Sequence, residues 1–306
     1  MPKITVVGSF VMDMVASVEE FPLAGQTVLG RSLRVYPGGK GANQCVAAAR
    51  LGAQTAMIGM VGSDGNGKTF LELFQEEGID CANVFVTEKE PTAIAQIQIN
   101  AAAENKIVVI PSANFVFGER EWRQCEKAIK ESAVVIMQME LNPGITEEII
   151  RTCARLSVPV VLNPAPARNI SGEVLGLATY VTPNETELEL LTGMPTDTEE
   201  NIYKAAGKLL SFGVRAVVAT LGKRGALVAD AHGKRIIPGY TVKVVDTVAA
   251  GDSFNGALAK CITEGKSLDE AVRYANAVGA LTVSKQGAIP SLPTAAEVEA
   301  FIKARA

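Results

Sequence analysis

Short apolar segments alternate with helical segments through the middle of this chain. Val134–Met139 and Val158–Leu162 have the pattern of buried strands, and Ile145–Leu156 between them has the pattern of a helix. Tyr180–Thr182 then adds a third strand. Strands that are joined by helices form βαβ units and pair in parallel. The alternation therefore predicts an α/β fold with a mostly parallel central sheet.

The same pattern extends toward both ends of the chain. Lys3–Val7, Gln54–Met60 and Ala216–Leu221 are further apolar strands, and Leu268–Ser284 is a long helix. No internal repeat, low-complexity tract or linker separates these segments. With 306 residues the chain can bury a large core. We predict a single α/β domain over residues 1–306.

Two stretches lack a helical pattern and depart from this alternation. Residues 14–36 consist of short β-like pieces, Thr27–Leu29 among them, with turns between them. Thr92–Ile99 and Lys106–Ile110 are two strands on either side of a polar connection. We predict that about residues 11–36 and 91–110 form a small second sheet that projects from the main body.

Charge and composition argue against several functional classes. The net charge is −4 and no basic block stands out, so a nucleic-acid partner is not expected. No apolar run reaches the roughly 18 residues of a membrane span, so we expect no membrane partner and a cytoplasmic location. The five cysteines lie far apart, which indicates reduced thiols. The only histidine, His232, lies in a predicted hairpin turn, so neither a zinc site nor a histidine-dependent triad is expected.

Asp246–Gly256 carries the strongest chemical signal in the sequence. It follows a β-rich run at 240–245 and opens an apolar helix at 254–262. Small residues before a helix leave its first N–H groups accessible, and these groups bind anions together with the positive end of the helix dipole. Asp252 stands in the same turn and places a carboxylate beside that anion site. This arrangement indicates phosphoryl transfer to a hydroxyl group.

Polar residues follow other strands as well, at the edge where open α/β sheets bind ligands. Asp13 comes shortly after the first strand, and Glu140 and Asn163 end two later strands. Pro37–Asn43 contains three glycines within four residues, which permits close approach of the backbone to a ligand. Its Lys40 side chain adds a polar contact. These residues are candidates for one binding site.

Asn184 and Glu187 lie three residues apart at the start of a predicted helix. At this spacing both side chains can lie on one face of the first turn and contact a ligand. The same spacing is also that of a capping box, in which Glu187 only supports the start of the helix. The spacing alone leaves both interpretations open.

Gly62–Thr69 matches the phosphate-binding loop G-x-x-x-x-G-K-[ST], so a P-loop NTPase is an alternative. Asp64 argues against it, because it would place a negative charge inside the phosphate cradle. Val134–Met139 also ends in Glu140 rather than in the aspartate that would hold Mg²⁺. We interpret Gly62–Thr69 as a turn that caps the following helix.

Together these motifs resemble the ribokinase-like carbohydrate kinases, the pfkB family, and within it the ribokinase branch. Pro37–Asn43 resembles the family's N-terminal signature and Asp246–Gly256 its C-terminal one. Asn163–Ala167 and Thr182–Glu187 are also similar to ribokinase segments, and the resemblance covers essentially the whole chain. It implies a ribokinase-like three-layer α/β fold in which the small projecting β-sheet is a lid over the sugar.

The resemblance implies an ATP-dependent sugar kinase that phosphorylates the primary 5-hydroxyl of a pentose, ribose first of all. Asp252 would accept the proton of that hydroxyl, and Ala249, Ala250 and Gly251 would form the γ-phosphate hole. The residues implied to contact the sugar are Val11, Asp13, Gly39, Lys40, Gly41, Asn43, Glu140 and Asp252. Those implied to contact the nucleotide are Asn184, Thr220, Gly222, Gly225, Gly251 and Asn276.

The resemblance also implies two cations and a partner chain. Glu187 would organise Mg²⁺ through water, and K⁺ would bind near the anion hole as an activator. The residues that match the K⁺ loops are Asp246, Val248, Thr282, Lys285, Gly287 and Ser291. The family further implies a homodimer that forms through the lid. A catalytically silent sugar-binding protein on the same fold remains an alternative, against which the presence of Asp252 argues.

One position departs from the ribokinase pattern. Ribokinases place Asn two residues before the sugar-binding Asp, whereas this chain has Val11 before Asp13. Valine cannot form a hydrogen bond, and a hydroxyl left unpaired in a buried site costs about 1–3 kcal/mol. This corresponds to discrimination on the order of 10- to 100-fold. We therefore expect weaker selection for the ribose 2-hydroxyl, with 2-deoxyribose or a related sugar as an alternative preferred substrate.

Overall fold

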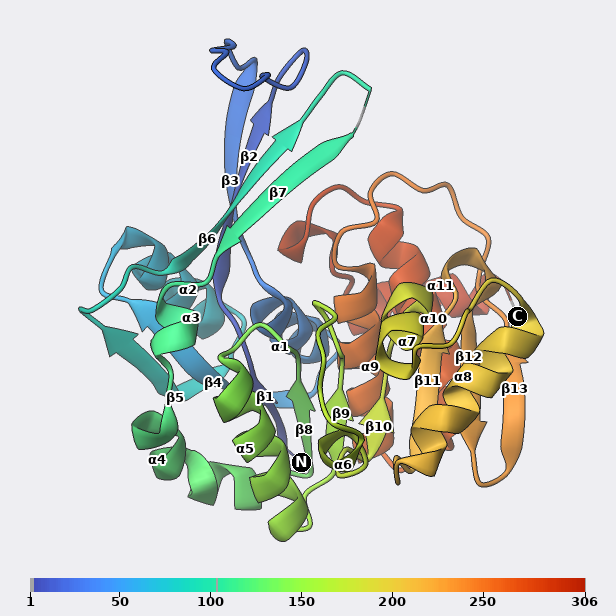
Figure 1. Cartoon of the computed structure of the whole chain (residues 1–306). Coiled ribbons are helices and arrows are strands. Elements are labelled where there is room, and N and C mark those ends of the chain that lie inside the picture. Colours follow the sequence, from blue (N-terminus) through green and yellow to red (C-terminus); the bar gives the residue numbers. More distant parts are fainter. Residues whose placement is uncertain (1–2, 103, 306) are drawn as a thin grey trace.

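The computed structural model describes residues 3–102 and 104–305. Within these residues a nine-stranded main sheet runs in the order β13-β12-β11-β10-β9-β8-β1-β4-β5 (Figure 1). All neighbouring strands are parallel except β12, which is antiparallel to both β11 and β13. The strands are β1 Lys3–Val7, β4 Gln54–Gly62, β5 Asp80–Thr87, β8 Val134–Met137, β9 Val160–Leu162, β10 Tyr180–Val181, β11 Ala216–Thr220, β12 Ala226–Asp230 and β13 Gly233–Ile237.

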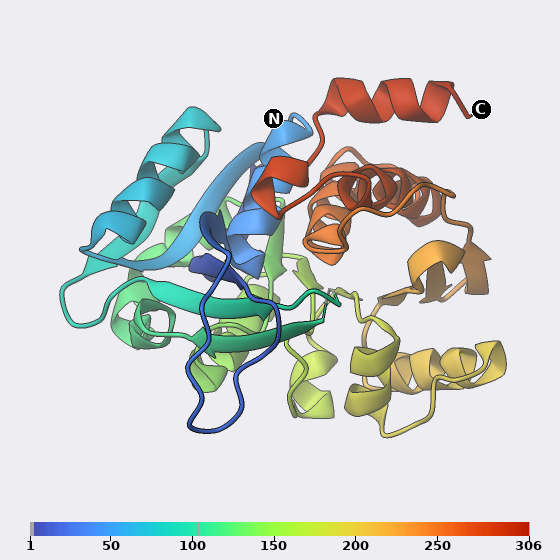
Figure 2. The same cartoon turned by 90° about the horizontal axis from the view of Figure 1, so that it is seen from above.

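Helices cover both faces of this sheet, so the main body has three layers (Figure 2). One face carries α1 Lys40–Arg50, α2 Gly65–Glu76, α9 Ala250–Thr263, α10 Leu268–Val283 and α11 Ala295–Lys303. The other face carries α3 Ala113–Val116, α4 Glu119–Lys130, α5 Pro143–Arg155, α6 Gly172–Leu175, α7 Glu185–Thr192 and α8 Glu199–Ser211. Two short 3₁₀ turns complete the set, η1 Gly222–Arg224 and η2 Ile289–Ser291.

Successive side chains of each strand point to opposite faces of the sheet, so the core consists of two hydrophobic clusters, one on each face. Ile4 and Val6 of β1 belong to the cluster beneath α1, α9 and α10, whereas Val7 belongs to the cluster beneath α4, α5 and α8. In β8, Ile136 faces the first cluster and Met137 the second. Parallel strands between two helical layers are apolar on both faces for this reason. The predicted α/β class is confirmed.

A second sheet of four strands rises from the top of the main body (Figure 1). Its order is β3-β2-β6-β7, with β2 Val11–Ser17, β3 Ser32–Gly38, β6 Ala93–Ile99 and β7 Asn105–Ile110. The β2–β3 and β6–β7 pairs are antiparallel, and β2 pairs with β6 in parallel. The strands predicted at 92–99 and 106–110 lie in this sheet, whereas Thr27–Leu29 forms no strand.

Other segments also differ from the sequence-based expectation. The run at 240–245 was predicted to be β-rich, but it forms no strand and leads as a loop to α9. β5 was not predicted, because Asn83 interrupts its apolar pattern. The helix expected at 254–262 begins earlier, at Ala250, and α1 begins at Lys40, within Pro37–Asn43. Part of each glycine-containing motif is therefore already helical.

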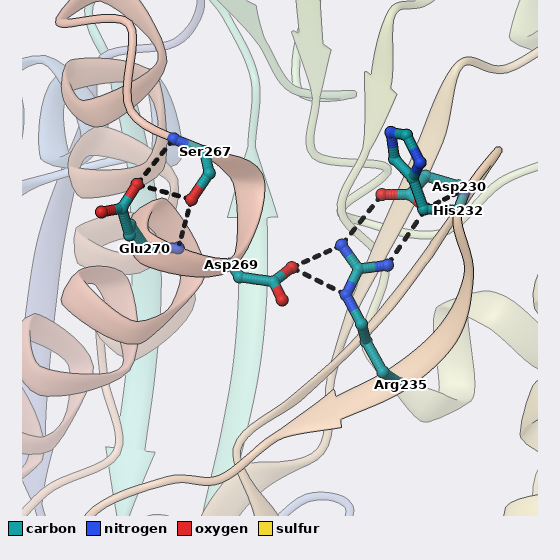
Figure 3. A network of polar contacts seen from close by, with 6 residues as sticks. All are labelled: Asp230, His232, Arg235, Ser267, Asp269 and Glu270. Carbon is teal, nitrogen blue, oxygen red and sulfur yellow. Dashed lines mark hydrogen bonds and ion pairs between the residues drawn. The ribbon is translucent and has the colours of Figure 1, made fainter.

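An ion-pair network fixes the far edge of the main sheet to α10 (Figure 3). Arg235 of β13 donates to both carboxylate oxygens of Asp230 in β12, each at 3.0 Å. It also donates from Nε to Asp269 Oδ1 at 2.7 Å, in the first turn of α10. His232 lies in the β12–β13 turn, where its N–H donates to Asp230, so the predicted hairpin tip is confirmed. The network holds the hairpin against the helix that carries Asn276.

Neither cysteine pairs nor a membrane span are found in the described part of the chain. All five cysteines are free, and only Cys81 is not fully buried. In residues 3–102 and 104–305, no helix has the length and apolar character that crossing a membrane requires.

Candidate active site

The carboxyl ends of the main-sheet strands meet a cavity of about 410 Å³ beneath the small sheet. Glu140 lies just beyond β8, Asn163 follows β9, and Thr182 follows β10. This is the edge at which open parallel sheets bind ligands. Ala95 and Ile97 of β6 and Ile107 and Val109 of β7 line the cavity from above. The site is thus polar at its base and apolar at its roof.

The cavity brings together residues that are far apart in the sequence. Most of the residues that the sequence analysis assigned to the sugar line it, namely Val11, Asp13, Gly39, Lys40, Asn43, Glu140 and Asp252. Gly41 does not line it: a Cβ there would lie 2.3 Å from the Ser9 nitrogen, so this residue instead lets α1 pack against the end of β1. Ala249, Ala250, Gly251, Asn184, Glu187 and Thr220 also line the cavity.

Close packing of α1 against α9 places Asp252 beside the first signature. A Cβ at Gly256 would lie 2.9 Å from Ala47 Cβ, from the Ala48 nitrogen and from the Gln44 oxygen. Only glycine permits this approach of the two helices. Asp252 lies one helical turn before Gly256 on α9, so its carboxylate reaches α1. There Asn43 Nδ2 donates to Asp252 Oδ2 at 2.8 Å.

The first turn of α9 provides free N–H groups beside this carboxylate. Ala249, which precedes the helix, has φ +61°, a left-handed conformation that is strained for a residue with a Cβ. No hydrogen bond is found for the N–H groups of Gly251 and Asp252 within the described residues. Unpaired N–H groups at a helix start bind anions. An anion bound there would lie next to Asp252.

Burial and mutual repulsion shift the ionisation of the acidic groups around the cavity. Burial, with the nearby charges of Glu140 and Asp252, raises the pKa of Asp13 to about 7. Burial also raises the pKa of Glu140, although Lys40 opposes the shift and Ser9 Oγ donates to its Oε2. Burial alone would lower the pKa of Lys40, but Asp252, Glu140 and other carboxylates raise it overall. Lys40 is therefore the positive centre of a negatively charged site.

The predicted helix start at Asn184 is both a cap and a part of the cavity wall. Asn184 Oδ1 accepts from the Glu187 N–H at 2.8 Å, and Glu187 Oε2 accepts from the Asn184 N–H at 2.9 Å. This is a complete capping box on α7. Both residues also line the cavity. Burial raises the pKa of Glu187, against the effect of its hydrogen bond from Asn184. The two interpretations are thus compatible.

A second cavity, of about 490 Å³, adjoins the first at Gly251. Thr220, Gly222, Gly225 and Asn276 line it, as do residues that sequence reasoning missed. The missed residues are Gly239, Tyr240, Thr241, Val242, Val244, Phe254, Gly279, Ala280 and Val283. The misassigned strand at 240–245 hid four of them, because a loop that lines a cavity has no periodic signature.

The two loops that were assigned to K⁺ lie side by side. Asp246 Oδ2 accepts from the Gly287 N–H at 3.0 Å, and Asp246 N–H donates to the Val283 carbonyl at 3.2 Å. Asp246 Oδ1 accepts from Val248 N–H at 3.0 Å. Thr282 is buried, and its backbone carbonyl accepts from Lys285 N–H. Ser291 is also buried and follows in η2, on the same loop.

The structure gives Gly62–Thr69 a capping role. Asp64 is the N-cap of α2 and accepts from Gly67 N–H at 2.8 Å. Its two oxygens also accept from the hydroxyl and the N–H of Thr92. The space in which a P-loop holds phosphate is therefore occupied by a carboxylate. The P-loop alternative is not supported, and the interpretation as a helix-capping turn holds.

Comparison with known proteins assigns the family. Residues 1–295 match the model of the pfkB family of carbohydrate kinases. The chain belongs to this family, and it is accordingly a phosphotransferase that acts on a sugar hydroxyl.

Individual relatives match along their whole length. The chain is 42% identical to a ribokinase of Haemophilus influenzae, over 98% of each protein. It is 37% identical to a ribokinase of Bacillus subtilis, over 99% of this chain and 100% of the relative. Among solved structures, Arabidopsis thaliana ribokinase in complex with ribose and ATP superposes with a TM-score of 0.94, at 32% identity and 99% coverage of both chains.

Replacement of Gly256 by alanine is expected to weaken the protein and its activity together. The new methyl group would force α1 and α9 apart, because two of its neighbours are backbone atoms. Overpacking of this kind costs about 1–3 kcal/mol, and in a chain of this size each kcal/mol lowers Tm by about 2–4 °C. We expect a roughly tenfold lower kcat, since Asp252 moves with α9. Gly65→Ala is the matched control, because a Cβ there meets nothing within 4 Å. Equal kcat values for the two variants would contradict this account.

Proposed function

We propose that this chain is an ATP-dependent ribose kinase that transfers the γ-phosphoryl group to the 5-hydroxyl of ribose. The observation that carries the proposal is the placement of Asp252. Its carboxylate lies in the first turn of α9, beside unpaired N–H groups, and faces a cavity lined by Asp13 and Glu140. The ribokinase relatives and the structure that holds ribose and ATP support the choice of substrates.

In this proposal the first cavity holds the sugar and the second holds the nucleotide. Asp13, Lys40, Asn43 and Glu140 bind ribose hydroxyls, and Asp252 accepts the proton of the 5-hydroxyl as the phosphoryl group arrives. The N–H groups of Ala250 and Gly251 stabilise the charge on the transferring group, and that of Ala250 does so in exchange for its long hydrogen bond to the Thr247 carbonyl, at 3.4 Å. The remaining nucleotide contacts come from Asn184, Thr220, Gly222, Gly225 and Asn276, which line the two cavities.

We also propose two cations for the working enzyme. Glu187 is the residue suited to Mg²⁺. Its carboxylate lies on the cavity wall, and the hydrogen bond from Asn184 N–H to one of its oxygens fixes its orientation there. Mg²⁺ would neutralise charge on the phosphates. The paired loops with Asp246, Val248, Thr282, Lys285, Gly287 and Ser291 would hold K⁺, several of them through backbone carbonyls. Such a kinase works where ATP is available, and we place it in the cytoplasm.

The small sheet is proposed to close over the sugar as a lid and to pair with a second copy. Its lower face is apolar where it lines the cavity, and it would exclude water during transfer. Leu33, Val35, Val108 and Ile110 are exposed, and β7 is an edge strand. Exposed apolar edges are usually covered by a partner. A homodimer at micromolar concentration is expected in sizing experiments; only monomer would contradict this.

Discrimination at the sugar 2-hydroxyl should depend on Val11. The relatives favour ribose, and a preference for 2-deoxyribose has no support among them. Val11 nevertheless lines the cavity and offers no hydrogen bond. We expect the ratio of kcat/KM for ribose to that for 2-deoxyribose to stay below about tenfold in the wild type, and Val11→Asn to raise it about tenfold. An unchanged ratio in this variant would refute the role of position 11.

A panel of sugars tests the proposed function. kcat/KM is measured with MgATP for ribose, 2-deoxyribose, fructose and adenosine, in the presence and absence of K⁺. We expect ribose to have the highest value and K⁺ to increase it. A higher value for fructose or adenosine would contradict the substrate assignment without affecting the family.

A further inference from the structure

A buried amide lies directly behind the catalytic carboxylate. Gln44 of α1 is fully buried, and its Nε2 donates to Asp252 Oδ1 at 3.0 Å. Asn43 donates to the other oxygen, Oδ2. Each carboxylate oxygen therefore accepts one hydrogen bond from α1. Gln44 lines neither cavity, so it does not contact a substrate in the two sites described above.

Gln44 is itself held by residues at the ends of two strands. Gln138, just beyond β8, donates from Nε2 to Gln44 Oε1 at 2.7 Å. Asn163, just beyond β9, accepts from Gln44 Nε2 at 3.1 Å and donates from its own Nδ2 to the Thr182 carbonyl at 3.2 Å. The chain Gln138–Gln44–Asp252 thus links the sheet edge to α9 through side chains that are all buried.

The Asp252 carboxylate determines which group donates and which accepts in this series of hydrogen bonds. An ionised carboxylate only accepts hydrogen bonds, so Gln44 must present its NH₂ group to Asp252. Its oxygen then faces Gln138, which must present an NH₂ group in turn. The Gln138 oxygen is left without a partner among the described residues, at the point where it packs against Gly8. A buried acceptor without a partner is unfavourable for folding. Its retention is understandable if the orientation of Gln44 serves the reaction.

We propose that Gln44 is a positioning residue for phosphoryl transfer: it fixes the Asp252 carboxylate in the orientation that accepts the hydroxyl proton, and Gln138 orients Gln44. This inference rests on the proposed function, in which Asp252 is the base. The expected consequence is specific. Loss of Gln44 should lower kcat while the KM for ribose stays the same, because the groups that bind the sugar remain in place.

A double-mutant cycle with Asp252 tests the proposal. Gln44→Met keeps the length of the side chain and removes its three hydrogen bonds, to Asp252, Asn163 and Gln138. In the wild-type background we expect kcat to fall about 30-fold, with the ribose and ATP KM values within twofold. In the Asp252→Ala background, measured with radiolabelled ATP, Gln44→Met should change kcat less than twofold. A purely structural defect would lower activity by the same factor in both backgrounds.

Two further variants separate positioning from general damage. Thr5→Val is the matched control: Thr5 is fully buried and loses one hydrogen bond, to Ser132 at 2.6 Å, away from the cavities. It should lower Tm and leave kcat unchanged. Gln138→Met removes the group that orients Gln44, and should lower kcat at least threefold with an unchanged ribose KM. It also tests the proposal if Gln44→Met does not fold.

The outcomes distinguish the positioning role of Gln44 from the proposed function of the enzyme. Wild-type kcat in both Gln44→Met and Gln138→Met, or equal losses in the two backgrounds of the cycle, would overturn the positioning role alone. Full activity of the Asp252→Ala variant would overturn the proposed function as well.

Discussion

Asp252→Asn should lower kcat by about 10³-fold, the largest effect of any single substitution predicted for this chain. Asparagine has the same shape but cannot accept the proton of the attacking hydroxyl. Asparagine can accept from only one of the two donors, Asn43 and Gln44, because its NH₂ group faces the other. Both contacts are made to the side-chain tip, so the helix start should remain intact. KM for ribose and for ATP should change less than about threefold, because other residues hold both substrates.

The control for this prediction is Asp80→Asn. Asp80 lies on the edge strand β5 and pairs with Lys3. This substitution changes the net charge by the same amount as Asp252→Asn and should keep wild-type kcat. Retention of more than about a tenth of wild-type kcat by Asp252→Asn would show that proton acceptance by this carboxylate is not part of the rate-limiting chemistry.

Asp13→Asn should produce the second-largest effect, through binding of the sugar. A carboxylate that accepts hydrogen bonds from sugar hydroxyls contributes about 1.5–3 kcal/mol for each bond. With two such bonds, kcat/KM for ribose should fall on the order of 10²-fold, mainly through KM. The pKa of Asp13 is about 7, chiefly because the group is buried. In the wild type, KM for ribose should therefore rise as the pH falls below about 7, whereas the variant should show little of this dependence.

The same substitution should stabilise the free protein at alkaline pH. The folded-state pKa of Asp13 is raised from 3.8 to about 7. Between these pH values the folded state retains a proton that the unfolded state has lost, so stability decreases as the pH rises through this window. Asp13→Asn removes that decrease. We expect Tm to be about 2–4 °C higher than wild type at pH 8 and nearly equal at pH 4. A lower Tm at pH 8 would contradict the pKa assigned to Asp13.

Sequence patterns predicted the elements of the fold that depend on residues close together in the sequence. Runs such as Val134–Met137 are apolar on both faces because helices cover both, and this signal is visible in one dimension. β5 was missed because it is an edge strand with one exposed face and polar residues such as Asn83. The loop at 240–245 was misassigned because Val242 and Val244 line the second cavity rather than a sheet. Apolar residues alone do not distinguish these two environments.

Sequence patterns likewise identified some residues of the candidate site and not others. Asp252, Lys40 and Asn43 lie in glycine-containing motifs, so their spacing marked them. Gln44 and Gln138 could not be identified, since each acts through a contact between segments that are 94 to 208 residues apart. Their roles depend on the close crossing of α1 and α9, which no local pattern encodes. Gly41 shows the converse case: it lies within a marked motif but faces the protein interior.

The most direct test of the account is the position of the phosphate in the product. The enzyme is incubated with ribose, MgATP and K⁺, and the product is followed by ³¹P and ¹H NMR. The account predicts ribose 5-phosphate in a one-to-one ratio with ADP, no ATP hydrolysis when the sugar is omitted, and no detectable product with Asp252→Asn on the same timescale. Phosphate on another hydroxyl, or sugar-independent release of inorganic phosphate, would contradict it.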